Sequence, residues 1–306
     1  GRMVPGNPNL EVTQYLLLDY PGEDDFLEAA LAEFRREKTG GTPLTVTYNG
    51  KSFDAQILKT RCLMKGRAPP VFCHADLLHP ARRLWKRVLP SCSQGAIETA
   101  VLGLDRTGDT PGAMAPDIWF AFLKTGETAA LRGICDHNAR DISGLARLFS
   151  AMARIAEDPL EAHGAYGYDL EGLALHWRKA CRPGACGWDG LCEGEIPETG
   201  KTLLSAAAGQ GHPRAALALA RDLFLAGDHN AGRGYLRRVA EGDHPPYTRA
   251  LACRSLAIDA ERRLKNPSLA LSYTEAALNR DMALPPRLRE DLTRRRDRLA
   301  AKAAAR

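Results

Sequence analysis

Strand-like segments stop about halfway along this chain of 306 residues, and this change constrains the fold most. Up to about residue 158, short apolar or β-branched runs alternate with segments of helical periodicity, whereas Ala, Leu and Arg dominate afterwards. Alternating strands and helices are typical of an α/β layer with a partly parallel sheet. Because the chain is also long for one compact core, we predict two domains, an α/β domain over 1–155 and an all-helical domain over 156–306.

The first domain is expected to contain three strands separated by helices. Segments 12–20, 44–49 and 71–79 are short, rich in apolar or β-branched residues and flanked by turn-forming residues, which predicts strands. Apolar residues at helical spacing predict the helices. They are expected over 24–38, 50–66, 81–89, 93–103, 116–126 and 141–158.

The second domain contains an internal repeat. Segment 214–243 resembles segment 249–281 at an offset of about 37 to 39 residues, so that Ala231 corresponds to Ala270. This offset is close to the period of helix–turn–helix repeats. Small residues where helices cross, followed by short turns, are what stacked helix pairs require. We therefore predict a tetratricopeptide-like array of helices.

Net charge and hydropathy exclude some classes of protein. The formal net charge is +5, and segment 287–306 alone holds eight Arg/Lys and three Asp/Glu, so the rest is close to neutral. A nucleic-acid footprint over the whole surface is therefore not indicated. No segment approaches the roughly 20 apolar residues of a membrane helix, and the N-terminus lacks the pattern of a signal peptide. We expect a cytoplasmic protein without a membrane contact, in which the eight cysteines stay reduced.

Two pairs of polar residues are candidates for chemistry. Asn49 and Asp54 flank the corner where the second strand meets a helix, although turn formation and the helix dipole also explain such residues there. His137 and Asp141 lie four residues apart in segment 135–149, which is expected to open a helix, and so share one face. Hydrolysis of a phosphodiester by two metal ions about 4 Å apart needs several carboxylates and gains from a His or Tyr near the attacking water.

The segments around these pairs resemble a known family. TYNGKSFDAQILKTR, HADLLHPARRLWKR, LGLDRTGDTPG, IWFAFLKTG and DHNARDISGLARL occur in this order between Val12 and Leu148. As a set, they resemble the YprB-type ribonuclease H-like domain, a branch of the DEDD 3′-to-5′ exonuclease superfamily. The resemblance implies a ribonuclease H-like α/β layer and hydrolysis of nucleic acid, DNA or RNA, with Mg²⁺ or Mn²⁺ as cofactor.

The resemblance also implies roles for single residues. Asp54 and Asp141 are similar to two of the metal-binding carboxylates, with Asn49 and Phe53 as neighbours of Asp54 in the corner. His137 stands four residues before Asp141, where one branch of the superfamily has Tyr, whereas the branch with His has it five residues before. Two roles therefore stay open for His137: positioning of the attacking water, or contact with a phosphate or a metal ligand.

The first motif of the superfamily, Asp-x-Glu on the first strand, does not occur before Asn49. By register, the first strand is expected upstream of Gly1. Two of the four metal-binding carboxylates are therefore expected outside this chain. The chain alone is then expected to bind Mg²⁺ weakly and to cleave nucleic acid little or not at all.

Three further groups of residues have both a structural and a functional interpretation. His176, Cys181, Cys186 and Cys192 include zinc-ligand types, but the tight C-x₂-C pair is missing, so unligated cysteines are expected. Asp76, at the end of the third strand, is expected near the site. A basic face on helix 81–89 fits either a solvated surface or contact with a nucleic-acid backbone; it consists of Arg82, Arg83, Lys86 and Arg87.

Two functions follow from these observations. The first is a divalent-metal-dependent 3′-to-5′ exonuclease joined to helical repeats, in which Asp54 and Asp141 bind metal and His137 lies near the attacking water. The alternative is a non-catalytic module that uses the nuclease fold to bind nucleic acid and the repeats to bind a protein partner. A strand with Asp-x-Glu upstream of Gly1 would distinguish them.

Overall fold

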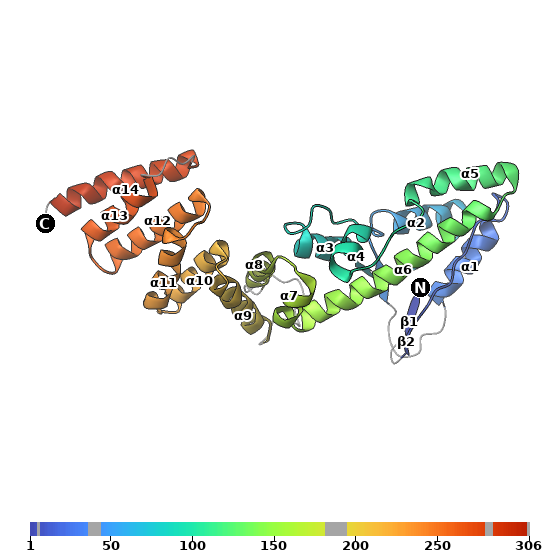
Figure 1. Ribbon diagram of the computed structural model, residues 1–306, viewed down its shortest axis with the longest axis horizontal. Helices are drawn as coiled ribbons and strands as arrows, with labels where there is room; N and C mark the ends of the chain where they lie inside the picture. Colours follow the sequence, from blue (N-terminus) through green and yellow to red (C-terminus); the bar gives the residue numbers. More distant parts are fainter. Residues whose placement is uncertain (5–6, 36–43, 181–194, 279–283, 305–306) are drawn as a thin grey trace. The chain divides into compact units, whose positions relative to one another are not determined.

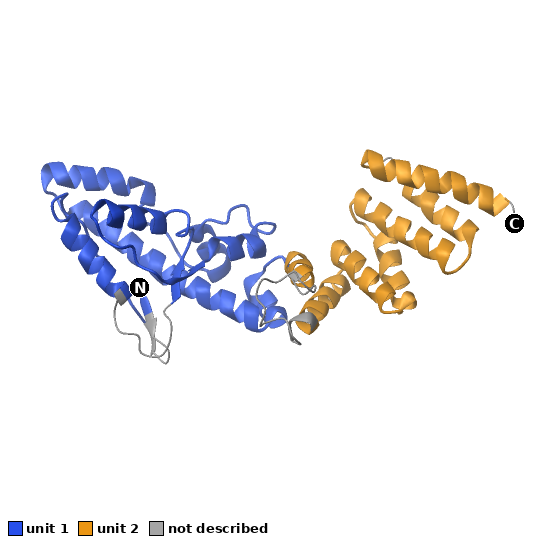
Figure 2. Ribbon diagram, turned by 180° about the vertical axis from the view of Figure 1, so that it is seen from behind, with its two compact units in different colours: residues 1–169 blue, residues 170–306 orange. Residues whose placement is uncertain are grey.

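The computed structural model describes residues 1–4, 7–35, 44–180, 195–278 and 284–304. The chain divides into two compact units, Gly1–Asp169 and Leu170–Arg306 (Figure 2). The first unit combines strands and helices and the second is helical, as the sequence predicts. The predicted boundary at 155 falls inside the last helical turn of a long helix of unit 1.

Unit 1 contains short strands among longer helices (Figure 1). In chain order, its elements are β1 (Arg2–Val4), β2 (Asn7–Glu11), α1 (Glu23–Arg35), β3 (Leu44–Thr47), α2 (Asp54–Met64), β4 (Cys73–Asp76), α3 (Leu78–Trp85), α4 (Gln94–Leu102), the 3₁₀-helix η1 (Gly112–Met114), α5 (Ala115–Thr125), α6 (Ala129–Glu157) and α7 (Pro159–Tyr166).

Strands β3 and β4 pair in parallel, with Leu44 opposite Cys73 and Thr47 opposite Asp76. Because two parallel strands need a crossover connection, helix α2 lies between them in the chain. This arrangement confirms the predicted parallel pairing. A separate antiparallel pair of β1 and β2 precedes it.

The predicted strand over 12–20 is wrong, because the structure assigns no strand there. Side-chain hydrogen bonds hold this segment in place instead of a strand ladder. Gln14 donates to the Cys135 carbonyl at 2.8 Å, and the Trp119 indole donates to the Leu17 carbonyl at 2.8 Å. An apolar run has the composition of a strand, but it forms one only where a neighbour supplies backbone partners. In the described residues, neither β3 nor β4 pairs with it.

Helix α6, with 29 residues, runs along unit 1 and contacts α4, α5, α7 and β3 (Figure 1). It begins at Ala129, so the prediction that His137 and Asp141 lie at the opening of a helix is wrong: both lie in its interior. The apolar spacing in the sequence does not indicate the first turns of α6, because these turns bury little apart from Leu131. Leu148 and Ile155 anchor the later turns in the core.

Helix α3 is held by its apolar face. Trp85 is completely buried, and its indole donates a hydrogen bond to the Tyr166 carbonyl at 3.0 Å. Ala81 and Leu84 are buried on the same face. The backbone N–H of Asp169 in turn donates to the Leu84 carbonyl at 2.8 Å. The opposite face of α3 therefore faces solvent.

Unit 2 is a succession of helices in which each contacts the next, and α10 also contacts α8 and α12. They are α8 (Leu170–Ala180), α9 (Glu195–Gly209), α10 (Pro213–Leu225), α11 (His229–Glu241), α12 (Pro246–Arg262), α13 (Pro267–Leu278) and α14 (Pro286–Ala304). Helices α10 and α11 form one copy of the predicted repeat, and α12 and α13 form the other. Leu219 in α10 and Leu256 in α12, which correspond in the repeat, are both buried.

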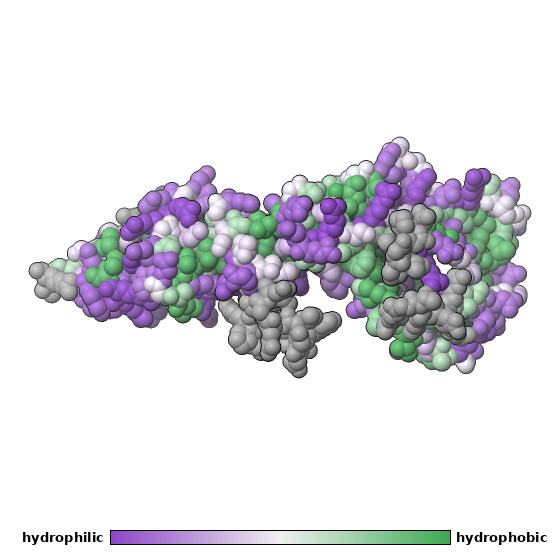
Figure 3. Space-filling model, turned by 90° about the horizontal axis from the view of Figure 1, so that it is seen from below, coloured by the Kyte–Doolittle hydropathy of each residue, from purple (hydrophilic) through white to green (hydrophobic). Residues whose placement is uncertain are grey.

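Among the described residues, we find no helix with both the length and the apolar character needed to cross a membrane. On the face seen in Figure 3, hydrophobic residues form small patches between hydrophilic ones.

Candidate functional site

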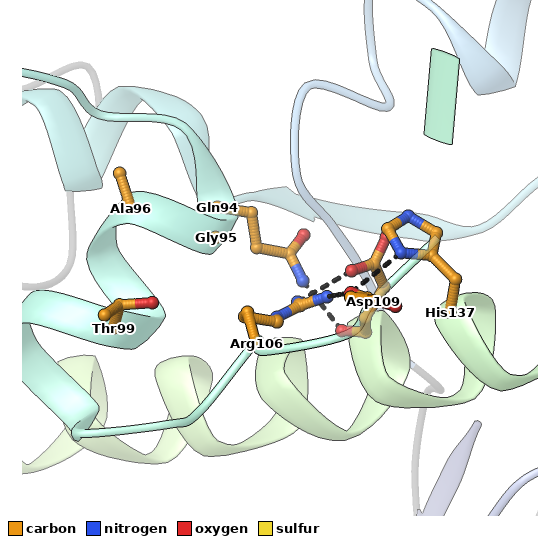
Figure 4. A pocket seen from close by; sticks show the side chains of 8 residues that line it. Gln94, Gly95, Ala96, Thr99, Arg106, Asp109 and His137 are labelled. Carbon is orange, nitrogen blue, oxygen red and sulfur yellow. Dashed lines mark hydrogen bonds and ion pairs between the residues drawn. The ribbon is translucent and has the colours of Figure 1, made fainter. Parts of the chain in front are cut away.

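A cavity of about 480 Å³ opens between helix α4, the loop that follows it and helix α6. Its lining combines small and polar residues of α4 with charged residues from the loop and α6 (Figure 4). The lining residues are Gln94, Gly95, Ala96, Thr99, Arg106, Asp109, His137 and Asp141.

Arg106, on the loop after α4, is the centre of the charged residues. Its Nε donates to Glu98 Oε2 at 2.9 Å, and its Nη1 and Nη2 lie 2.8 Å from Asp109 Oδ2 and 2.7 Å from Asp141 Oδ1. Its side chain is only 18% exposed. Burial alone would lower the pKa of Arg106, but the three carboxylates raise it above its ordinary value. The guanidinium therefore stays charged and ties the loop to both helices.

Helices α4 and α6 meet around the side chain of Glu98. Its side chain is fully buried between the helices, where Gln94 Nε2 donates to its Oε1 at 2.8 Å and to the Asp141 carbonyl at 2.7 Å. Gly144 faces it from α6, and a Cβ there would overlap the Glu98 carboxylate. A buried carboxylate is tolerable only when it is paired, and Arg106 supplies the opposite charge.

His137 lies between two carboxylates. Its Nε2 is 3.3 Å from Asp141 Oδ2, one helical turn further along α6. Its Nδ1 is buried and lies 2.9 Å from Asp109 Oδ2. Arg140 Nη1 lies 3.0 Å from the other oxygen of Asp109. Burial alone would raise the pKa of Asp109, but Arg106, His137 and Arg140 lower it to about 2.

The strand–helix corner is organised by Asp76. This buried carboxylate accepts hydrogen bonds from the backbone N–H groups of Asn49, Lys51 and Leu78, at 2.7, 3.0 and 3.1 Å. Asn49 has a φ of 65°, a left-handed conformation that Asn tolerates better than most residues. Asp54 is the exposed first residue of α2, and the preceding Phe53 is 62% exposed.

The structure thus brings some of the predicted site residues together. His137 and Asp141 line one cavity, and Asp76 contacts Asn49. Asp54 is not among the lining residues, and no described contact joins it to Asp141. The convergence of Asp54 with this cavity stays a prediction.

The remaining candidates lie elsewhere. Helix α3 and the residues after it expose a basic face, as its amphipathic pattern predicts; it comprises Arg82, Arg83, Lys86 and Arg87. Its contact with nucleic acid stays a prediction. The cysteine cluster at Cys181, Cys186 and Cys192 lies outside the described residues.

Sequence reasoning missed Glu98, Arg106 and Asp109. Glu98 could have been noticed as a single charge within an otherwise apolar helix, GAIETAVL. Arg106 and Asp109 belong to a loop, LDRTGD, in which charged residues alternate with turn formers. Nothing in the local pattern indicates that this loop folds onto α6, since the contact spans more than thirty positions.

Whether these residues can hold a divalent metal ion depends on their chemical type and on their arrangement. Carboxylates are suitable ligands for Mg²⁺ or Mn²⁺. In the described residues, however, no group of three or more His, Cys, Asp or Glu side chains is arranged to hold a metal ion. Asp141 instead faces the Arg106 guanidinium, and Asp109 faces two arginines. The donors therefore suit the metal, but their arrangement does not.

Comparison with known proteins identifies the first unit. Residues 4–153 match the family model described as RNase_H superfamily. The chain is also 43% identical over 141 residues to the uncharacterized protein YprB of Bacillus subtilis (strain 168). That match covers 45% of this chain and 33% of YprB, so the chain spans about a third of its relative. No solved structure matches the chain. Residues 4–153 of this chain therefore belong to the RNase H superfamily.

Proposed function

We propose that the RNase H-like domain hydrolyses phosphodiester bonds of nucleic acid, as a divalent-metal-dependent 3′-to-5′ exonuclease. The observation that carries the proposal is the cavity of an RNase H superfamily domain in which His137 and Asp141 lie 3.3 Å apart. Attack by water on a phosphodiester requires a group that orients the water and accepts its proton. His137, with 23% of its side chain exposed beside two carboxylates, is suited to that task.

In this proposal Asp54 and Asp141 bind the divalent cations, which when bound would neutralise charge on the phosphate. Because the arrangement described above does not hold a metal ion, the residues themselves support a narrower statement. Asp141 supplies negative charge at the cavity mouth, with 38% of its side chain exposed. His137 is held in place by its position between Asp109 and Asp141.

The test is a cleavage assay on the purified chain extended at its N-terminus by a strand that carries Asp-x-Glu. Single- and double-stranded DNA and RNA, labelled at either end, are incubated with Mg²⁺, with Mn²⁺ or with a chelator. We expect metal-dependent shortening from the 3′ end that is lost in both Asp54→Asn and Asp141→Asn. His137→Ala should lower the rate by roughly 10² or more while changing metal affinity less. Cleavage that survives Asp141→Asn would place the catalytic centre elsewhere.

The alternative function is a non-catalytic module for nucleic acid, with the helical unit for a protein partner. The observation that favours it is that Arg106 already neutralises the carboxylates of the cavity. Binding would then depend on the basic face of α3, where phosphate contacts make affinity fall with salt.

This alternative is tested by binding without cleavage. Lys86→Glu is expected to weaken binding of single-stranded nucleic acid and to reduce the slope of log affinity against log salt by about 1 or more. Lys201→Glu is the matched control, because Lys201 is 73% exposed in the other unit and pairs only locally with Glu198. Equal binding by both variants would exclude the α3 face as the contact surface.

A further inference from the structure

The carboxylates of the cavity already have a cation. The guanidinium of Arg106 reaches Glu98, Asp109 and Asp141 from three of its nitrogen atoms. Figure 4 shows Arg106 beside Asp109. A divalent ion at Asp141 would lie next to this fixed positive charge, which repels it. One oxygen of Asp109 and one of Asp141, the ligand type that Mg²⁺ or Mn²⁺ needs, are also engaged with Arg106.

Arg106 belongs to a loop that changes direction at two glycines. It lies on the loop between α4 and η1, and not within either element. Glycines on either side of it, Gly103 with a φ of 63° and Gly108 with a φ of 72°, adopt left-handed conformations. Such positions let a loop change direction at low energetic cost.

The two ends of the ion-pair group differ in burial. Glu98 is fully buried, whereas 38% of the Asp141 side chain is exposed at the cavity. Glu98 therefore depends on Arg106 for its counter-charge, whereas water reaches Asp141. Removal of Arg106 would free the Asp141 carboxylate, with His137 beside it.

We propose that Arg106 is a resident internal cation, which closes the carboxylates of Asp109 and Asp141 to divalent metal. This inference rests on the proposed function, since it concerns the same site. It explains why the donors suit a divalent metal while their arrangement does not.

The test measures binding of Mn²⁺ by calorimetry on the 306-residue chain. Arg106→Met removes the charge and keeps an unbranched side chain. We expect it to bind Mn²⁺ at least about tenfold more tightly than the parent, because the repelling charge is gone. The gain should disappear when Asp141→Asn is added. Arg106→Lys, which keeps the positive charge, should behave as the parent.

The matched control is Arg140→Met. Arg140 also contacts Asp109, at 3.0 Å, but it is half exposed and its described contacts do not include Asp141. We expect a much smaller gain in Mn²⁺ affinity than for Arg106→Met. Equal gains in both variants would mean that overall charge, and not the Arg106 contact with Asp141, controls metal binding, and would overturn the proposal.

Arg106→Met leaves the buried Glu98 without its counter-charge, so the variant can lose its fold. The double variant Arg106→Met/Glu98→Gln removes that buried charge and leaves Asp109 and Asp141 intact. Circular dichroism checks that it is folded, and it should show the same gain. Mn²⁺ binding no tighter than the parent in this folded double variant would overturn the proposal and make Arg106 a structural residue only.

The two proposals fail in different ways. Tighter Mn²⁺ binding by Arg106→Met, without cleavage by the chain extended with the Asp-x-Glu strand, would support the internal cation and contradict the nuclease. Tight Mn²⁺ binding and metal-dependent cleavage by the parent itself would support the nuclease and contradict the internal cation.

Discussion

Asp76 offers the sharpest test of how the strand–helix corner is held. Its carboxylate is 9% exposed and accepts three backbone N–H groups, from Asn49, Lys51 and Leu78. Hydrogen bonds to charged groups contribute roughly 1.5–3 kcal/mol each, and bonds that share one acceptor are not additive. We therefore expect Asp76→Ala to lower the free energy of unfolding of unit 1 by about 4 kcal/mol.

Asp76→Asn is the more selective change. One oxygen accepts from both Asn49 and Leu78, and the other accepts from Lys51 alone. An amide can keep the first oxygen but turns its NH₂ group toward the Lys51 N–H, so that two donors face each other. We expect a loss of about 2 kcal/mol, concentrated at Lys51.

The pH dependence follows from the same contacts. Burial alone would raise the pKa of Asp76, but the three N–H donors lower it below its ordinary value of 3.8. A lowered pKa stabilises the fold above pH 3.8, and this stabilisation is lost as the pH falls through the lower, folded-state value. The stability difference between the parent and Asp76→Asn should therefore be constant near pH 7 and shrink below pH 4.

Hydrogen exchange measured by mass spectrometry is the suitable assay, because it reads unit 1 separately from unit 2. Peptides that cover 45–64 report the amides of the corner. In the parent, exchange at Lys51 should be slow, and in both variants it should be faster. Unchanged exchange at Lys51 in Asp76→Ala, or a loss of stability below about 1 kcal/mol, would refute this account of the corner.

Three other substitutions test separate features. Gly144→Ala should cost about 1–3 kcal/mol and shift the thermal midpoint down, because the new Cβ meets the buried Glu98 carboxylate; an unchanged midpoint would show that the helices separate easily. Asp259→Ala should destabilise unit 2 by roughly 3 kcal/mol in urea unfolding, because it leaves the 16%-exposed Arg233 without the carboxylate that neutralises it at 2.8 Å; a loss under 1 kcal/mol would contradict this. Asn49→Gly should keep stability in urea unfolding, whereas Asn49→Ala should lose about 1 kcal/mol at a φ of 65°; equal effects would refute a backbone role.

The order of elements could be read from the sequence because it depends on local patterns. A β-branched run gave β3, a short apolar run ahead of Cys73–Asp76 gave β4, and apolar spacing gave α1 to α6. The repeat was visible because buried positions such as Leu219 and Leu256 recur in equivalent helices. Segment 12–20 failed because its composition describes a strand, while pairing depends on a neighbour.

The site could be predicted only where one element holds both partners. His137 and Asp141 are one turn apart on α6, so their contact follows from helix geometry. The contact of Arg106 with Asp141 joins a loop to a helix, and the local sequence pattern does not indicate it. The same is true of Asp76, whose carboxylate caps a turn that lies 25 residues before it.

The arrangement of unit 2, in which each helix contacts the next, has a consequence for how the protein can change in evolution. A helix pair such as α10 and α11 meets the rest of the unit mainly through its sequence neighbours α9 and α12, with a smaller contact between α10 and α8, so its duplication or deletion leaves most of the remaining contacts in register. The length of this unit can therefore vary by whole helix pairs while its packing is preserved. In unit 1, β3 and β4 pair across an intervening helix, so an insertion of the same size would have to avoid both strands.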